Sequence, residues 1–190
     1  MNLPNPARAT VKILEYPETR QVYDFDCGAN GLLSMLVFAG IEPREDRIIK
    51  LAETTEADGT DTEHVRFVFG YYGQPIKAGE GMTPNDLRRA IDAGHPTMIT
   101  LQAYPEDTKI PWDQMWDQGH WVVAIGYDEN RIIFEDPASF HRTWLPDGEL
   151  IARWHDLDSV KVTKPKKIIG WGCTLLVAGV YKNDLMDHMD

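Results

Sequence analysis

The chain has 190 residues, 43% of them hydrophobic, and its 30 acidic and 19 basic residues give a formal net charge of −11 at pH 7. This charge opposes binding to nucleic acid or to anionic membranes, and no apolar run is long enough for insertion across a bilayer. The length predicts one domain over residues 1–182, with residues 183–190 as a flexible tail.

The first half of the chain has the pattern of four helices. We expect them at residues 26–39, 43–53, 61–69 and 83–93. Asp26 is placed to cap the first helix and Gly40 to end it. Thr83 followed by Pro84 is a strong start signal for the fourth.

After Gly94 the pattern changes to strands. We expect strands at residues 97–101, 121–127, 131–134, 140–145 and 174–181, and a short helix near residues 149–154. Residues 128–130 have the composition of a hairpin turn, and residues 103–119 that of a long loop. Helices followed by antiparallel strands predict an α+β fold.

Cys27 is the candidate nucleophile. It lies at the first turn of the first predicted helix, where free backbone N–H groups and the helix dipole favour a thiolate. The alternative is a buried structural thiol, which we expect for Cys173 because an apolar run follows it. Two cysteines make no disulfide framework, and the N-terminus has no secretory signal pattern, so we expect a cytoplasmic location.

His120 and Asp136 complete the parts of a thiol acyl-transfer site. His120 is the candidate base and proton donor, and Asp136 the carboxylate that orients it. Gln21, six residues before Cys27, is placed to form an oxyanion hole with the Cys27 N–H. Each residue also has a structural alternative: a strand histidine, a turn-forming Asp before Pro137, and a surface Gln.

These motifs together resemble the bacteriocin-processing cysteine peptidases, papain-like enzymes that cut leader peptides after a double glycine. The resemblance spans residues 16–143 and rests on Gln21, an Asp-Cys-Gly-Ala run at 26–29, Gly-His-Trp-Val-Val at 119–123 and Asp-Pro at 136–137. It implies a papain-like α+β fold, with an N-terminal helical half packed on a C-terminal antiparallel sheet. It implies the same four roles for Gln21, Cys27, His120 and Asp136.

The best-known members of that family carry this domain at the N-terminus of an export transporter. We find no membrane or ATP-binding segment here, so we expect a free-standing domain whose substrate need not contain a double glycine. The region after Leu145 lies outside the resemblance.

Three tryptophans are candidates for the walls of a substrate groove, with core packing as the alternative: Trp112, Trp116 and Trp121. The remaining histidines have no metal-ligand spacing, and there is no glycine-rich phosphate loop, so we expect neither a metal nor another cofactor.

The predicted function is therefore a cysteine peptidase, or thiol hydrolase, acting on a peptide or protein with small residues before the cut. The same site would serve an acyl transferase, amidase or transpeptidase, and a third possibility is an inactive peptide-binding module. The sequence leaves open the physiological substrate, hydrolysis against transfer, and the oligomeric state.

Overall fold

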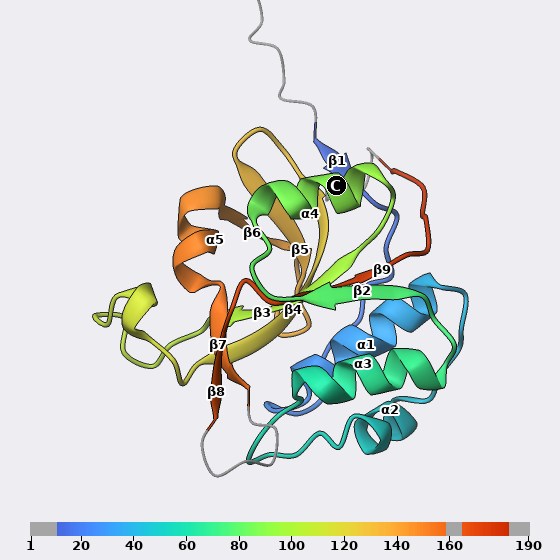
Figure 1. Cartoon of the computed structure of the whole chain (residues 1–190), viewed down its shortest axis with the longest axis horizontal. Coiled ribbons are helices and arrows are strands. Elements are labelled where there is room, and N and C mark those ends of the chain that lie inside the picture. The colour runs from blue at the N-terminus through green and yellow to red at the C-terminus, as the bar shows by residue number, and fades with distance from the viewer. Residues whose placement is uncertain (1–10, 159–164, 183–190) are drawn as a thin grey trace, which may run out of the picture.

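The computed structural model describes residues 11–158 and 165–182, and the predicted α+β fold is confirmed (Figure 1). The helices are α1 Cys27–Phe38, α2 Glu45–Leu51, α3 Thr62–Tyr71, α4 Pro84–Asp92 and α5 Asp147–Arg153, with a 3₁₀ turn, η1, at Trp112–Gln114. The strands are β1 Lys12–Ile13, β2 Ile76–Gly79, β3 Thr97–Gln102, β4 Gly119–Tyr127, β5 Arg131–Glu135, β6 Thr143–Pro146, β7 His155–Asp158, β8 Lys166–Ile169 and β9 Gly172–Leu175.

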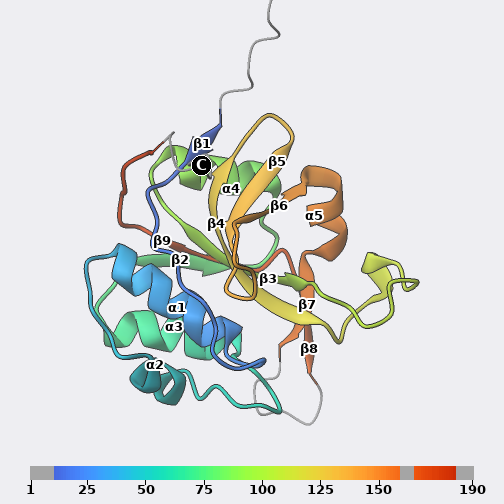
Figure 2. The same ribbon diagram turned by 180° about the vertical axis from the view of Figure 1, so that it is seen from behind.

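A seven-stranded antiparallel sheet runs through the middle of the molecule in the order β2-β9-β3-β4-β5-β6, with β1 paired to β4. Helices α1, α2 and α3 cover one face, and α4 and α5 cover the other (Figures 1 and 2). The strands β7 and β8 form a separate hairpin beside β3. The helical half therefore packs on the sheet as predicted.

Each face of the sheet has its own hydrophobic core, and side chains of β4 point alternately into one and the other. Trp121, Val123 and Ile125 pack with the α1 side, whereas Val122 and Ala124 pack with the α4 and α5 side. Burial of these two apolar faces drives the helices onto the sheet.

The pairing of β5 with β4 ends at Glu135, which lies opposite Val123. The first residues of β4, including His120, therefore have no β5 partner, and Asp136 leaves the sheet beside them. This end of the sheet is where the candidate site forms.

Several sequence predictions need correction. The last strand is shorter than residues 174–181, because after Leu175 the backbone turns to other partners: the Leu176 N–H donates to the Pro75 carbonyl and the Gly179 N–H to the Gly94 carbonyl. The strand expected from residue 140 begins at Thr143. Four strands were not predicted: β1, β2, β7 and β8. The predicted tail, residues 183–190, lies outside the described residues.

Candidate active site

Helix α1 begins at Cys27, whose side chain is buried with 8% exposure. The predicted Asp26 cap is wrong, because the Asp26 carboxylate makes no capping bond and turns back to the preceding loop. There it accepts hydrogen bonds from the Val22 N–H at 3.3 Å and the Tyr23 N–H at 3.2 Å. The carboxylate thus fixes the loop that leads into the helix, and the N–H groups of the first turn stay free of it.

Gly28 lets the start of this helix approach its surroundings closely. A Cβ atom at Gly28 would lie 2.5 Å from the Thr60 side chain and 2.9 Å from the Trp121 ring. Any larger residue would push Cys27 away from the end of the sheet, so glycine follows the cysteine for a steric reason.

His120 and Asp136 form a buried pair, in which His120 Nε2 lies 2.8 Å from Asp136 Oδ1. Three further groups donate to the Asp136 carboxylate: the Tyr104 hydroxyl at 2.5 Å, the Ala138 N–H at 3.0 Å and the Thr143 hydroxyl at 3.2 Å. Burial raises the pKa of Asp136, but the contacts with His120, the Tyr104 hydroxyl and the Ala138 N–H outweigh it and lower the pKa overall. The carboxylate is therefore held ionised and fixed in orientation.

The imidazole of His120 lies between the carboxylate and the thiol. Burial by itself lowers the pKa of His120. The contacts with Asp136 and with the Cys27 side chain raise it by more than burial lowers it, so that the pKa lies at about 9. Because Nε2 faces Asp136, Nδ1 is the nitrogen left to interact with Cys27. The imidazole therefore holds a proton at neutral pH and can deliver it on the side of the sulfur.

Gln21 is joined to this site through its backbone, whose N–H donates to the Pro137 carbonyl at 3.0 Å. Its side-chain amide donates to the Tyr23 carbonyl at 2.9 Å. Its Oε1 atom is buried and has no hydrogen-bond partner among the described residues. The amide thus points along the loop before Cys27, and its role at an oxyanion stays a prediction.

Tyr104 makes a contact with the candidate site that the sequence pattern does not predict. Its hydroxyl bonds Asp136, and its ring lies edge-to-face with the His120 ring at 5.3 Å. Its φ of 52° lies in the left-handed region, which non-glycine residues rarely adopt. The sequence signal for Tyr104 is its place in the long loop that leads to His120, among apolar groups of the kind that line peptide grooves.

The three candidate tryptophans lie in three different environments in the structure. Trp121 is buried in the core, where its N–H donates to the Thr60 carbonyl at 3.0 Å, so it does not line a groove. Trp116 lies against the His155 ring at 4.3 Å and below the Lys167 ammonium, so it anchors the loop to the β7–β8 hairpin. Trp112 lies against the Arg153 guanidinium at 3.6 Å.

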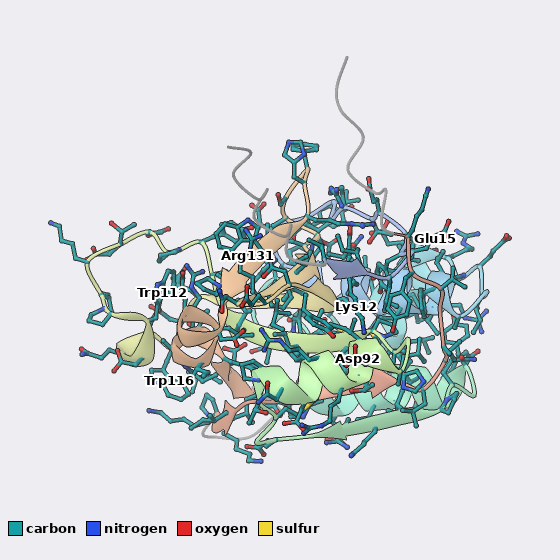
Figure 3. The ribbon with its side chains drawn as sticks, turned by 90° about the horizontal axis from the view of Figure 1, so that it is seen from above. Lys12, Glu15, Asp92, Trp112, Trp116 and Arg131 are labelled. Atoms are coloured by element: carbon teal, nitrogen blue, oxygen red, sulfur yellow. The ribbon has the colours of Figure 1, made fainter. Side chains whose placement is uncertain are left out.

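Of the three, Trp112 lines a pocket of about 340 Å³. The same pocket is lined by His120 and Asp136. Figure 3 shows Trp112 and Trp116 at the end of the molecule from which the 103–118 loop projects.

Within residues 11–158 and 165–182, no three His, Cys, Asp or Glu side chains gather in a way that could hold a metal ion. Over the same ranges, none of the helices combines the length and the apolar character required to cross a membrane.

Comparison with known proteins places the chain by its sequence. Residues 13–162 match the model of the Peptidase_C39 like family. The chain belongs to this family. A comparison with curated proteins finds no match.

Solved structures agree with this C39-like assignment at the level of the fold. A C39-like peptidase from Bacillus anthracis has 17% identity and a TM-score of 0.65, covering 89% of this chain and 99% of that one. The peptidase domain of Streptococcus ComA, a bifunctional ABC transporter, has 18% identity and a TM-score of 0.62, covering 85% and 98%. A double glycine motif protease from an AMS/PCAT transporter, in complex with the leader peptide, has 17% identity and a TM-score of 0.59, covering 86% and 93%. The chain thus has the papain-like fold of C39 peptidase domains.

Proposed function

We propose that this chain is a cysteine peptidase that cleaves a peptide bond through Cys27, His120 and Asp136. The observation that carries the proposal is the environment of His120, whose imidazole pairs with the Asp136 carboxylate at 2.8 Å and whose pKa is raised by that carboxylate and by the Cys27 side chain. Membership of the C39-like family supports the peptidase class.

In the proposed reaction the Cys27 sulfur attacks the carbonyl carbon of the substrate, so a C–S bond forms and the carbonyl oxygen becomes an oxyanion. The C–N bond then breaks, and His120 gives its proton to the leaving amine. In the second step His120 takes a proton from water, the hydroxide attacks the thioester, and the acid product leaves the thiol. Asp136 holds the imidazole in the orientation that both steps need.

The oxyanion requires hydrogen-bond donors. The Cys27 N–H at the start of α1 is one, since it has no partner within the first turn of a helix. Gln21 supplies the second when its amide turns from the Tyr23 carbonyl toward the substrate. Gln21 would thereby give up its hydrogen bond to the Tyr23 carbonyl and donate to the oxyanion, an acceptor that develops only in the transition state.

For the substrate we propose a leader-like peptide with small residues before the cut. The support is that a protein of the same fold is a double glycine motif protease found with a leader peptide. A reducing compartment such as the cytoplasm suits this chemistry, because both cysteines of the chain are free thiols.

The experiment that tests the proposal compares Cys27→Ala with Cys173→Ala on quenched fluorescent peptides that carry Gly-Gly before the cut. Cys173 is fully buried in the core, and burial raises the pKa of its thiol to about 12. We expect Cys27→Ala to lose all turnover while staying folded, and Cys173→Ala to keep it. Turnover by purified Cys27→Ala would exclude the thiol mechanism.

A further inference from the structure

The pocket of about 340 Å³ has a defined position relative to the reacting groups. Its floor is the α5-facing side of the sheet, with Leu101, Val122 and Phe134, and its walls include Trp112 and Leu145. His120 and Asp136 lie in its wall, whereas Cys27 does not. The pocket therefore begins on the far side of the imidazole from the thiol.

The direction of the reaction assigns this side to one part of the substrate. In thiol acyl transfer the acyl part stays on Cys27, and the amine departs after it accepts the proton of His120. The chain that follows the scissile bond must therefore leave past the imidazole. A pocket lined by that imidazole lies along its path.

We propose that this pocket, the leaving-side pocket, binds the side chain of the residue directly after the scissile bond, and that it selects a large apolar side chain. The inference rests on the proposed function and deepens it. A leader sequence lies before the scissile bond, whereas this pocket adds a specificity determinant for the residue after it.

The lining of the leaving-side pocket favours an apolar occupant. Leu101, Val122 and Phe134 are at most 3% exposed, so they belong to the packed core and form a rigid floor. A volume near 340 Å³ is at the lower end of the roughly 300–1,000 Å³ typical of ligand pockets. It accommodates a side chain rather than a folded segment.

The charged groups in the wall already have counter-charges or donors. Arg153 donates to Glu149 on the same helix and stacks on Trp112, and Asp136 accepts from four donors. The buried Nε of Arg153 has no hydrogen-bond partner among the described residues, so an acidic side chain would gain at most that one bond beside a guanidinium that Glu149 already neutralises. A charged substrate side chain would therefore lose its water without gaining a free counter-charge, which is unfavourable. We expect the pocket to reject Asp, Glu, Lys and Arg.

The loop that carries Trp112 is held in place at its ends. The Ala103 N–H donates to the Gln118 carbonyl at 2.9 Å, and the His155 ring lies 2.6 Å from the Met115 carbonyl oxygen. Trp112 is therefore presented by an anchored loop, as a wall that exists before the substrate arrives. A preformed wall can discriminate between side chains without paying for its own ordering.

The first experiment reads the residue after the cut directly. The enzyme is incubated with peptides from a digested proteome, and the new N-termini are identified by mass spectrometry, with the Cys27→Ala protein as background. We expect Leu, Ile, Met and Phe at the new N-terminus to exceed Gly, Ser and the charged residues by about tenfold, the scale of discrimination by an apolar pocket. New N-termini with background composition would overturn the proposal.

Two variants connect the preference to the pocket. Trp112→Ala and Leu145→Ala each remove part of the lining, and both side chains are only partly buried, so the core should survive. We expect the kcat/KM ratio for Leu over Ala after the cut to fall about tenfold. Ile151→Ala is the matched control, because Ile151 is exposed on α5 and does not line the pocket. An unchanged ratio in both variants would contradict the assignment.

A binding measurement separates this inference from the proposed function. Peptides X-Ser-Gly-Ser amide, with X as Gly, Leu or Phe, are titrated into Cys27→Ala and followed by calorimetry and by the Trp112 indole NMR signal. Binding that favours Leu and Phe and shifts that signal supports the pocket, even if no peptide is cleaved by the wild-type protein. Cleavage without any preference in either assay would uphold the peptidase and reject the pocket. Absence of both cleavage and binding would reject both.

Discussion

The proton on His120 determines how the candidate site should depend on pH. Its pKa of about 9 lies above the ordinary value of 6.5, through the contacts with Asp136 and Cys27 and despite burial. We expect kcat/KM to fall above about pH 9, as the imidazole loses the proton that it gives to the leaving amine. A pH profile from 5 to 10.5 tests this.

The Asp136→Asn variant is the control for that profile. Loss of the carboxylate removes a contact that raises the pKa of His120, so the alkaline limb should move to lower pH. The free energy of unfolding should depend on pH in the same direction. Because the pKa of His120 is higher in the folded protein than in the unfolded chain, protonated His120 stabilises the fold fully below pH 6.5, and this contribution is lost as the pH rises toward 9. An unmoved limb would mean that another group titrates there.

Tyr104 is proposed as a positioning residue for the His120–Asp136 pair. Its hydroxyl donates to the second carboxylate oxygen and its ring borders the imidazole, so Tyr104→Phe removes the bond and keeps the ring. A hydrogen bond to a charged group contributes roughly 1.5–3 kcal/mol, and we expect kcat to fall about fivefold or more with KM little changed. The alkaline limb of the kcat/KM profile against pH should also shift in Tyr104→Phe. Wild-type kinetics in Tyr104→Phe would refute the role.

At the scale of elements, the sequence predicted what local signals specify. The four helices before Gly94 carry caps, prolines or glycines at their ends, and the three central strands carry apolar runs. The hairpin β7–β8 was missed because its residues are charged or mixed, with Leu157 opposite Lys167 and Asp158 opposite Lys166. Its polar side chains bind distant segments, Asp158 accepting from Thr62 and Lys166 pairing with Glu80, and a single-strand pattern does not reveal such contacts.

The 103–118 loop combines two tasks that the sequence could not separate. Trp116 lies between the His155 ring and the Lys167 ammonium of the β7–β8 hairpin, whereas Trp112 lines the leaving-side pocket. We expect Trp116→Ala to cost about 1–2 kcal/mol in the free energy of unfolding, lowering Tm by about 3–6 °C. Calorimetry measures this. If Trp116→Ala changed the ranking of substrates strongly and left Tm unchanged, Trp116 would contribute to specificity and would not anchor the loop.

At the scale of the whole molecule, the site depends on contacts between distant parts of the chain. The candidates Cys27, His120 and Asp136 were predicted from residue types in the right order. The structure pairs His120 with Asp136, and the Cys27 side chain lies near enough to raise the pKa of His120. The contacts of Tyr104 with Asp136 and of Glu135 with Arg20 were not predicted, because these partners lie 32 and 115 residues apart in the sequence. Side-chain direction across such separations follows from packing and not from local pattern.

Glu135 ties the segment before Cys27 to the sheet. Its carboxylate, 2% exposed, accepts from Arg20 Nη1 at 2.6 Å and the Thr19 N–H at 3.2 Å, and it lies 3.5 Å from Arg142 Nε. Asn30 in α1 holds the same segment by donating to the Arg20 carbonyl at 2.8 Å. The residue beside Asp136 in sequence therefore positions the backbone that carries Gln21.

Glu135→Gln should accordingly affect both stability and rate. Removal of the charge leaves the partly buried Arg20 guanidinium without its counter-ion and Arg142 with only Glu18 at 4.0 Å, and we expect a loss of about 2–4 kcal/mol in the free energy of unfolding. Salt at 1 M should not reproduce the loss, because a buried pair is poorly screened. Misplacement of Gln21 should also lower kcat beyond what the unfolded fraction explains.

The matched control is Glu18→Gln, since Glu18 is 67% exposed and its nearest approach to Arg142 is 4.0 Å. An exposed contact of this kind contributes at most about 1 kcal/mol, so this variant should unfold and turn over like the wild type. Urea unfolding gives the stability of both variants, and active-site titration corrects the rates for inactive protein. Equal behaviour of the two would mean that the buried carboxylate does not connect the N-terminal segment to the sheet. A loss of stability with full kcat would limit Glu135 to the fold and leave Gln21 positioned by Pro137 alone.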